Sequence, residues 1–593
     1  MEETRNTSTD SVRVCQNCKT SFVIEPDDFA FYEKIKVPPP TFCWKCRFQR
    51  RLAWRNERKP FWNTSAKSGK KIISIYPPYA GMTVYDEKEW RADDWDGLDY
   101  GVDYDFSRPF FTQITNLWKK VPVNGPHTEN NVNSDFVICS GWGKNNYLVC
   151  NTSGAEDSAY GNAMDECKFC FDGSHITKCE RCYGSFWLKN SYQTHFSTRG
   201  MENASSWFLF GCSGMTNSFG CVNMRKKSYC IFNKQYARQE YEEKIKAMKL
   251  NTWSGLQKAK TEAYAFALKF PVAYLNGILN NDVTGEYVSE SKNVHYGYLV
   301  NGGKDLKYVQ YLQVPGSEDS HDITIWGHSN ILAYENCQSG LGISNSHFLK
   351  SSWSEVIDSE YCMDCRGVSN CFGCVGLKNK KFCIFNKQYS EAEYYVLRKK
   401  IIEHMNTAPY VDKKGRVYKY GEFFPAELSA FEYNVSLAQE HFPLTKEQTL
   451  QEGYGWYEQP ASDYKTTIKP ENIPDAIEDV PDSITKEILE CIQCKKAYRI
   501  IDMELAFLRQ EKLPIPRQCI DCRHNERISQ RAKAFLYHRA CECKGGGSGN
   551  GIYQNATKHS HGESPCTNEF ETSHGKESSE IIYCHPCFYE EVA

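Results

Sequence analysis

The sequence predicts a multidomain, mainly β protein. Small zinc-ribbon or treble-clef modules at both ends flank a duplicated, irregular, cysteine-rich β-solenoid with capping helices. Three observations lead to this fold class: a cysteine pattern occurs twice, 476 positions apart; short polar and small-residue motifs recur between about 130 and 236; and the last of these motifs returns 153 positions later. With 593 residues and 14% aromatic side chains, the chain has enough core material for several domains.

Two CxxC pairs near each end of the chain enclose 24 residues. The first set is Cys15, Cys18, Cys43 and Cys46, and the second is Cys491, Cys494, Cys519 and Cys522. Two such knuckles facing each other place four thiolates around one Zn²⁺ at about 2.3 Å, a closed structural site with no position for water. We therefore predict one zinc ion in a first ribbon, 1–60, and one in a second ribbon, 485–535.

The two sets agree beyond their ligands, since Ile24 matches Ile500 and Phe31 matches Phe507. The segment CQNCKTSFVIEPDDFAFYEKIKVPPPTFCWKCR resembles the small "probable zinc-ribbon" domains, which are treble-clef-like. The whole chain, including DWDGLDYG, FSRPFF, CIFNKQY and NEFETS, is similar to uncharacterised predicted zinc-binding proteins of small uncultured bacteria. The resemblance implies zinc and a cytoplasmic setting, and it implies no reaction.

Composition narrows the classes of function. A net charge of −3 excludes a globally basic nucleic-acid binder, so basic patches are judged one by one. The N-terminus has no basic segment leading into an apolar run, and no apolar stretch reaches about 18 residues. We therefore expect a cytoplasmic protein whose 28 cysteines stay reduced as metal ligands or buried thiols.

Rows of arginines follow the second knuckle of each ribbon at four-residue spacing. They are Arg47, Arg51 and Arg55 in the first module, and Arg523, Arg527 and Arg531 in the second. On a helix each row forms one stripe, and guanidinium groups beside aromatic rings suit phosphate contact and base stacking. We predict RNA or a ribonucleoprotein as the partner. The alternatives are a solvated helix face, arginines neutralised by acids of the chain such as Asp93–Asp96, and a protein partner.

Residues 61–129 read as an α/β insert, with short strands in IISIY and MTVY and a helix in DFSRPFFTQITNLWKKV that has Ser107 as its N-cap. Solenoid half 1 covers 130–250 and half 2 covers 286–406. Rung motifs recur in steps of 9 to 14 residues, and a predicted helix caps each half; the second opens with the capping box Ser390-x2-Glu393. A helical bridge, 251–285, joins the halves.

Cysteines within the solenoid have knuckle-like spacing, as in Cys167-x2-Cys170 and Cys179-x2-Cys182. Further zinc, an iron–sulfur site or redox chemistry are alternatives. Equivalent rungs carry Ser, Ala, Thr or Gly in the same slots, which favours buried packing positions.

Residues 407–484 form a connector. It begins with a hairpin around Gly415, and a proline-containing acidic tether follows over 458–482. The tether would let the second ribbon reposition, and the alternative is that it packs along the solenoid.

The C-terminal segment, 536–593, offers a third zinc site. Its five cysteines are Cys541, Cys543, Cys566, Cys584 and Cys587. We assign the last three to zinc together with either Cys541 or Cys543, while His559 and His561 are alternative fourth ligands. The chain would then hold about three zinc ions. Tyr85-Asp86-x2-Glu89 echoes Tyr583-Cys584-x2-Cys587, without metal ligands.

No phosphate loop, dinucleotide fingerprint, nucleophile elbow or HExxH motif is present, and no catalytic residue is predicted. Three hypotheses follow. The favoured one is a non-catalytic zinc protein whose terminal ribbons bind RNA or a ribonucleoprotein, with the solenoid as spacer and protein-interaction face. The others are a protein–protein scaffold and an enzyme with a cleft between solenoid and insert.

Overall fold

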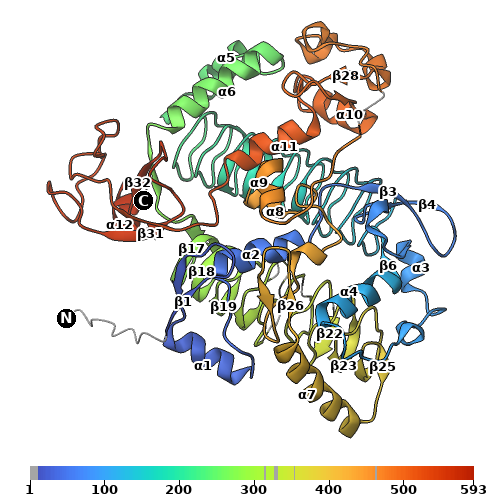
Figure 1. Cartoon of the computed structure of the whole chain (residues 1–593). Coiled ribbons are helices and arrows are strands. Elements are labelled where there is room, and N and C mark those ends of the chain that lie inside the picture. Colours follow the sequence, from blue (N-terminus) through green and yellow to red (C-terminus); the bar gives the residue numbers. More distant parts are fainter. Residues whose placement is uncertain are drawn as a thin grey trace. The chain divides into compact units, whose positions relative to one another are not determined.

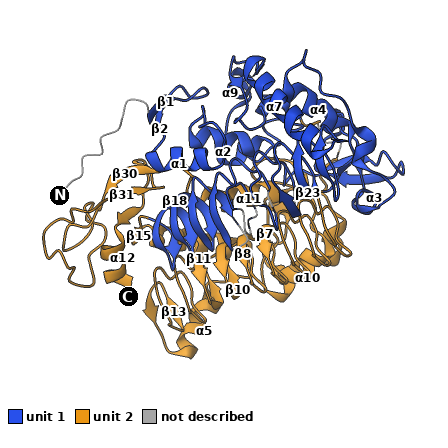
Figure 2. Cartoon of the chain, turned by 90° about the horizontal axis from the view of Figure 1, so that it is seen from below, with its two compact units in different colours: residues 1–126, 275–458 blue, residues 127–274, 459–593 orange. Residues whose placement is uncertain are grey.

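A computed structural model describes residues 11–312, 315–325, 327, 331–338, 340–352, 354–460 and 464–592. The chain divides into two compact units, each drawn from two separate stretches of sequence. Unit 1 comprises Met1–Pro126 and Leu275–Glu458, and unit 2 comprises His127–Tyr274 and Gln459–Ala593 (Figure 2). The protein is thus multidomain and rich in short strands, with four-cysteine clusters near both ends. Among the described residues, no helix has the length and apolar character needed to cross a membrane.

Unit 2 contains a stack of short parallel rungs, residues 129–231, which we call ladder 1 (Figure 1). A residue in one rung pairs with the residue 12 positions later in the sequence, which lies in the next rung, as in Lys144↔Glu156↔Lys168. Lys144 N–H donates to Ala155 O at 3.0 Å, and its carbonyl accepts from Asp157 N at 2.9 Å. Where pairing is longest, the strands are β7 (Asn162–Asp165), β8 (Ser174–Thr177), β9 (Phe186–Lys189), β10 (Tyr192–His195), β11 (Thr198–Met201) and β12 (Ala204–Trp207).

The 12-residue turn follows from a backbone period of three. From His127 to Phe232 every third residue has a positive φ, between 46° and 67°. L-residues adopt this left-handed region at a cost of roughly 1–2 kcal/mol each, which the inter-rung hydrogen bonds offset. The interior follows the same period: Val149, Met164, Cys167 and Ile176 are buried together and differ in position by multiples of three. This period is neither that of a helix nor that of a flat strand.

Ladder thiols occupy a slot that hydroxyls also fill. Cys167 Sγ lies 3.4 Å from Asp165 O and 3.5 Å from Ile176 O, that is, two residues back and nine ahead. Ser185 Oγ makes the same pair of contacts at 3.2 Å each, to Tyr183 O and Thr194 O. Because a serine and a cysteine satisfy this slot alike, the geometry favours packing positions over metal ligands.

Unit 1 contains a second stack, residues 277–388, which we call ladder 2. Its steps vary from 11 (Gly277↔Val288) through 12 (Tyr298↔Gln310) and 13 (Cys337↔Lys350) to 14 (Gly303↔Ser317). One sheet contains β16 (Gly277–Ile278), β17 (Asn281–Ser289), β18 (Lys292–Asn301), β19 (Gly303–Lys307), β20 (Gln310–Leu312) and β21 (Ser317–His321). A second contains β22 (Ser354–Ile357), β23 (Arg366–Phe372), β24 (Lys381–Ile384) and β25 (Lys387–Gln388).

Both ladders end in the same hairpin. β13 (Cys230–Ile231) pairs with β14 (Lys234–Gln235), and β24 pairs with β25 in the equivalent register. Asn233 and Asn386 each bond both backbone groups of one earlier residue, Val222 and Val375, at 2.8–3.0 Å. The expected helices follow as α5 (Arg238–Ala247) and α7 (Glu391–Thr407), and Ser390 and Glu393 form the predicted capping box.

Three local expectations were wrong. The bridge has one helix, α6 (Trp253–Ala267), which packs on ladder 1, and the next apolar stretch forms strands β15 (Pro271–Ala273) and β16. In the insert, α4 (Phe110–Lys120) begins after Pro109, whose fixed φ opens the helix, and Ser107 Oγ donates to Asp105 at 2.6 Å instead. The expected tether, of which 461–463 lie outside the described residues, forms the short 3-10 turns η5 (Pro470–Asn472), η6 (Ile477–Asp479) and η7 (Asp482–Lys486). Ile473, Ile477 and Ile484 are buried in one cluster with the second CxxC module and with ladder 1, so the alternative of packing along the ladder holds.

The remaining connections are short elements. The insert contains β3 (Phe61–Thr64), β4 (Lys71–Ser74), η2 (Pro78–Ala80), β5 (Val84–Tyr85), α3 (Glu87–Arg91), η3 (Gly97–Tyr100) and β6 (Val123–Asn124). After α7, the hairpin of β26 (Tyr410–Val411) and β27 (Val417–Tyr418) confirms the turn at Gly415. Then come η4 (Ala426–Leu428), α8 (Ala438–His441) and α9 (Lys446–Gln451).

The ladder slot gives a first prediction. Replacing Cys167, Cys170, Cys179 and Cys182 together by serine should leave the zinc content of the protein unchanged, because a serine hydroxyl reaches the same two carbonyls. Each substitution should lower the free energy of unfolding by about 1 kcal/mol or less. Elemental analysis and urea unfolding measure the two quantities. A loss of bound metal in this variant would show that these thiols are ligands.

Candidate metal centres

The two CxxC modules have the same backbone. The first consists of β1 (Val12–Val14), β2 (Ser21–Val23), α1 (Pro26–Lys34) and α2 (Trp44–Ala53). The second consists of β28 (Leu489–Glu490), β29 (Ala497–Tyr498), α10 (Asp502–Gln510) and α11 (Ile520–Ser529). Both helices of one module begin and end 476 positions from those of the other. The duplication read from the cysteines therefore extends to every helix of the module.

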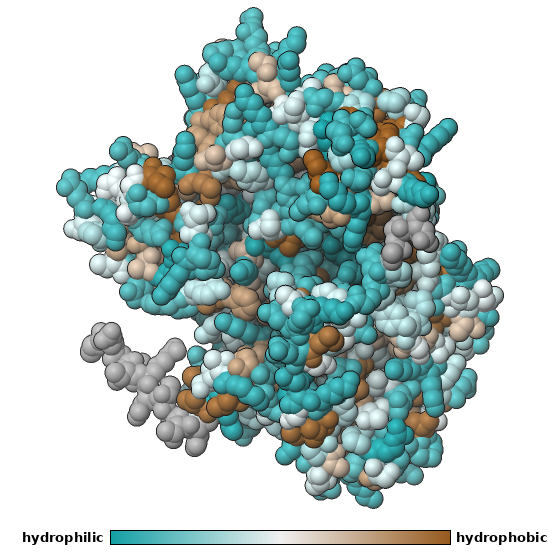
Figure 3. Space-filling model, turned by 45° about the horizontal axis from the view of Figure 1, so that its top comes forward, coloured by the Kyte–Doolittle hydropathy of each residue, from teal (hydrophilic) through white to brown (hydrophobic). Residues whose placement is uncertain are grey.

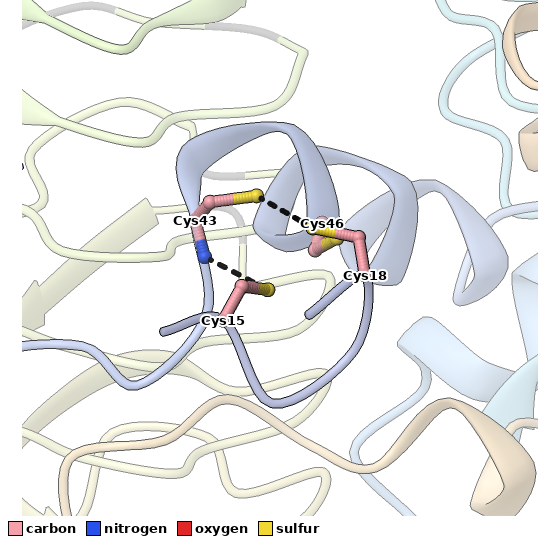
Figure 4. A group of neighbouring side chains, drawn as sticks. All are labelled: Cys15, Cys18, Cys43 and Cys46. Carbon is pink, nitrogen blue, oxygen red and sulfur yellow. Dashed lines mark hydrogen bonds between the residues drawn. The ribbon is translucent and has the colours of Figure 1, made fainter. Parts of the chain in front are cut away.

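In each module the four predicted cysteines converge, with their sulfur atoms within 4.8 Å of one another. Figure 4 shows the first site: Cys43 N–H points to Cys15 Sγ at 3.3 Å, and Cys18 Sγ lies 3.7 Å from Cys43 Sγ. In the second site the equivalent distances are 3.2 Å, from Cys519 N to Cys491 Sγ, and 3.6 Å, from Cys494 Sγ to Cys519 Sγ. Four sulfurs at this spacing fit a tetrahedral zinc ion.

A helix begins at each site and supports thiolate charge there. Cys43 is the N-cap of α2 and Cys519 is the N-cap of α11, so the positive end of each helix faces the sulfurs, and the N–H groups of Cys46 and Cys522 bond the sulfurs of Cys43 and Cys519. Burial opposes ionisation of Cys491, yet backbone N–H groups of Cys494 and Cys519 bring its pKa down to about 7. The backbone around Cys491 thus favours its thiolate form, whereas burial raises the pKa of its neighbours Cys519 and Cys522.

The C-terminal module repeats this arrangement. It contains β30 (Tyr537–Ala540), β31 (Glu569–Thr572), β32 (Ile581–Tyr583) and α12 (His585–Val592), and β32 pairs with β15. Four sulfurs lie within 4.8 Å of one another: Cys541, Cys566, Cys584 and Cys587. Cys584, which directly precedes α12, donates its N–H to Cys541 Sγ at 3.2 Å, the same contact as in the two CxxC modules. Of the two candidates for the fourth ligand, the structure places Cys541 here.

Cys543 belongs to a different group. Its sulfur lies with one nitrogen each of His559 and His561 and with Cys587 Sγ, all within 4.8 Å of one another. The sequence presented the two histidines as alternatives for a single site. Their joint arrangement depends on a loop between β30 and β31 whose path the sequence pattern does not give.

The insert of unit 1 has the backbone of the C-terminal module without its cysteines. β5 pairs with β6 in parallel as β32 pairs with β15, and Ala66 N–H bonds Val84 O as Glu542 N–H bonds Ile582 O. Where the C-terminal module has sulfurs, Ser65 Oγ donates to Glu89, and Asp86 and Glu89 form a capping box on α3. Hydrogen bonds thus take the positions that sulfur atoms occupy in the C-terminal module.

The arginine row of the first module is buried in unit 1 and paired with carboxylates. Together they form a cluster of three cations and three anions: Arg47, Arg50, Arg51, Asp322, Glu335 and Glu422. Arg47 Nε lies 2.7 Å from Asp322, and Arg50 lies 2.5 Å from Glu335. Arg51 also donates to Thr324 and Gln310 of ladder 2, at 2.6 Å each. Burial alone would lower the pKa of Arg47, but Asp322 and its neighbours raise it well above the usual value.

Unit 2 repeats the cluster with two cations and two anions. Arg523 lies 2.7 Å from Glu504 and 3.2 Å from Asp172, and Arg527 lies 2.8 Å from Asp172. All four side chains are at most 7% exposed. Asp172 belongs to ladder 1, so the ion pairs join the second CxxC module to that ladder. Stacking of Phe171 on Phe507, with ring centroids 4.3 Å apart, adds an apolar contact beside them.

These contacts correct the expected exposed stripe. Arg47, Arg51, Arg523 and Arg527 face the ladders of their own units and not solvent, so a phosphate group cannot reach them in this fold. Arg55 is also buried, 2.6 Å from Glu57. The sixth member, Arg531, is half-buried. The chain's own acids neutralise the rows, as one alternative held, although the partners are ladder and module carboxylates and not Asp93–Asp96. Glu504, which pairs with Arg523, stands at the position equivalent to Asp28, which pairs with Lys307 of ladder 2. These matching acids are a sequence signal for buried charge in both modules.

Comparison with known proteins adds little. No protein-family model and no curated protein matches the chain. Among solved structures, one match is a "putative acetyltransferase" from Desulfovibrio desulfuricans G20, with 9% identity over 49% of this chain and 86% of that one. Its TM-score is 0.09, so this likeness supports no conclusion on fold or function.

The four-cysteine sites of the two CxxC modules give a second prediction. Cys18→Ser and Cys494→Ser should each remove one zinc ion per chain, because a three-sulfur site binds zinc much more weakly than the closed site. Native mass spectrometry counts the ions. Cys182→Ser, which changes a ladder thiol, is the matched control and should retain every ion. Full zinc content in Cys494→Ser would exclude the four cysteines of the second CxxC module as a zinc site.

The buried charges give a third prediction. Arg523→Ala leaves Glu504 and Asp172 with too little positive charge and should destabilise unit 2 by about 3–5 kcal/mol. Arg499→Ala, at an exposed position of the same module, should change stability by no more than about 0.5 kcal/mol.

The double variant Glu504→Gln/Arg523→Met restores charge balance and should be more stable than the sum of its single variants predicts. Urea unfolding of the four proteins measures this coupling. Additive effects would mean that Arg523 and Glu504 contribute independently and that their pairing is unimportant.

Proposed function

We propose that this protein is a non-catalytic zinc-binding scaffold. In this proposal the CxxC modules are zinc ribbons of treble-clef type, the ladders are two halves of a β-solenoid, and each ribbon is fixed on one half. The observation that carries the proposal is the all-cysteine ligand set of three clusters. A zinc ion held by four thiolates has no open position for water or substrate, so its role is structural.

The contacts around each module support the same role. A CxxC module of this size has too small a core to fold without its ion, and binding of zinc is then coupled to folding. Once folded, its second helix presents arginines to a ladder carboxylate, Asp322 in unit 1 and Asp172 in unit 2. Zinc therefore orders the surface that covers one face of the ladder.

An uncovered face of ladder 1 is a suitable surface for a protein partner. Lys144, Glu156, Lys168 and Glu180 lie one above another at 12-residue steps, with alternating charge. Lys168 lies 3.2 Å from Glu156, and their side chains are 54% and 41% exposed. Such pairs contribute little to stability but give a partner a regular charge pattern to match. On the face of the protein shown in Figure 3, apolar residues are scattered among hydrophilic ones.

RNA or ribonucleoprotein binding stays a prediction, but the buried arginine rows no longer support it. If RNA binds, other exposed residues must carry the contact. The two hypotheses differ in a measurable way, because phosphate contacts weaken steeply with salt and protein interfaces with apolar or mixed surfaces weaken less.

The test is crosslinking of the full-length protein in its own cells, followed by identification of what is attached. We expect proteins and no enrichment of RNA over a bead control. Charge reversal on the exposed face of ladder 1, Lys144→Glu with Lys168→Glu, should reduce the amount of those proteins that is crosslinked. Reversal at exposed Arg499 is the matched control and should not. Ultraviolet crosslinking to RNA that salt weakens steeply would contradict the scaffold proposal and restore the RNA hypothesis.

A further inference from the structure

The C-terminal module contains two donor groups that share one sulfur atom. The first is the four-cysteine cluster of Cys541, Cys566, Cys584 and Cys587. The second consists of Cys543, His559, His561 and the same Cys587. In each group all four donor atoms lie within 4.8 Å of one another. Both donor sets are those that Zn²⁺ takes in structural sites, Cys₄ and Cys₂His₂.

The ring of His559 is oriented as in a metal-bound histidine. Its Nδ1 lies 3.2 Å from Cys543 Sγ, and its Nε2 lies 2.8 Å from Glu591 Oε1. Since the carboxylate accepts the Nε2 proton, the lone pair of Nδ1 is directed toward the sulfur group. A carboxylate behind a histidine fixes the tautomer and raises the basicity of the ligand nitrogen. Glu591 has a fully buried side chain and is itself held by the N–H of Ala556 at 2.8 Å.

His561 has the opposite ring nitrogen available. Its Nδ1 lies 2.7 Å from the carbonyl oxygen of Ser564, and its Nε2 lies 3.3 Å from Cys587 Sγ. A carbonyl can only accept a hydrogen bond, so Nδ1 carries the proton and Nε2 carries the lone pair. The two histidines thus direct one lone pair each into the same group of sulfurs, and each is fixed in place by a different acceptor.

Amide donors surround the sulfurs. Asn555 donates its side-chain N–H to Cys543 Sγ at 3.3 Å, and Asn568 donates to Cys584 Sγ at 3.3 Å. The amide of Asn555 is oriented by the hydroxyl of Tyr583, which donates to Asn555 Oδ1 at 2.9 Å. Hydrogen bonds of this kind stabilise thiolate charge next to a metal and define the outer shell of both groups.

We propose that this module binds two zinc ions bridged by the thiolate of Cys587. One ion takes the sulfurs of Cys541, Cys566, Cys584 and Cys587. The other takes the sulfurs of Cys543 and Cys587 with His559 Nδ1 and His561 Nε2. A thiolate sulfur has enough lone pairs to bind two ions. Because Cys587 serves both ions, seven side chains supply four ligands to each of them. The inference rests on the zinc-binding part of the proposed function and raises the expected content from about three to four ions per chain.

Native mass spectrometry of the full chain counts the ions. We expect four zinc ions in the wild-type protein and three in His559→Ala/His561→Ala. His538→Ala changes an exposed histidine of the same module that bonds Glu569 and Glu571, and it should retain four. Three ions in the wild type, or four in the double histidine variant, would overturn the second site. Loss of zinc from all sites would instead contradict the proposed function itself.

A spectroscopic test needs no variant and so does not depend on folding of a mutant. The wild-type protein is loaded with ¹¹³Cd²⁺ and its cadmium NMR spectrum is recorded. A shared thiolate predicts two resonances that are coupled to each other, one at a four-sulfur shift and one at a two-sulfur, two-nitrogen shift. The ribbon sites should give two further uncoupled four-sulfur resonances. Three uncoupled four-sulfur resonances would overturn the inference and leave the three Cys₄ sites intact. Four resonances without coupling would exclude the bridge.

Discussion

The fold depends on charge pairs that are buried between each CxxC module and the ladder of the same unit. In unit 2, Arg523 and Arg527 of α11 share Asp172 of ladder 1; in unit 1, Arg47 and Arg51 of α2 share Asp322 of ladder 2. Buried ionised side chains are tolerated only when opposite charges balance one another and the side chains are fixed in good hydrogen-bonding geometry. The proposed zinc ion, which fixes the first turn of the arginine-bearing helix, supplies that geometry.

The duplicated element is therefore larger than a zinc module. It consists of a module, the arginines on its second helix, and a ladder with a matching aspartate. In unit 1 the module precedes its ladder in the sequence, and in unit 2 the module follows it. The insert and the C-terminal module are a second duplicated pair, in which Ser65, Asp86 and Glu89 occupy the places of three cysteines. The same backbone arrangement thus holds either a four-cysteine cluster or a set of hydrogen bonds at equivalent positions.

Features with a strict spacing could be predicted from the sequence. The two four-cysteine sets, the helix that follows each CIFNKQY motif and the Ser390 capping box all lie where the sequence predicted them. The sequence motifs predict steps of 9 to 14 residues and not the regular turn of 12 in ladder 1. The backbone period of three is not visible in the sequence, because side chains of very different type occupy equivalent positions. Burial of Arg47 and the grouping of Cys543 with two histidines depend on partners far away in sequence, Asp322 among them, which a local pattern cannot identify.

The central claim is that zinc orders the helix through which each module packs on its ladder. Amide hydrogen exchange of the full-length protein, with zinc and after chelation, tests it directly. The account predicts that chelation removes protection from α2 and α11 and also from the ladder residues that they cover, around Asp322 and Asp172. Protection of α11 and of the backbone near Asp172 that survives complete removal of zinc would contradict it.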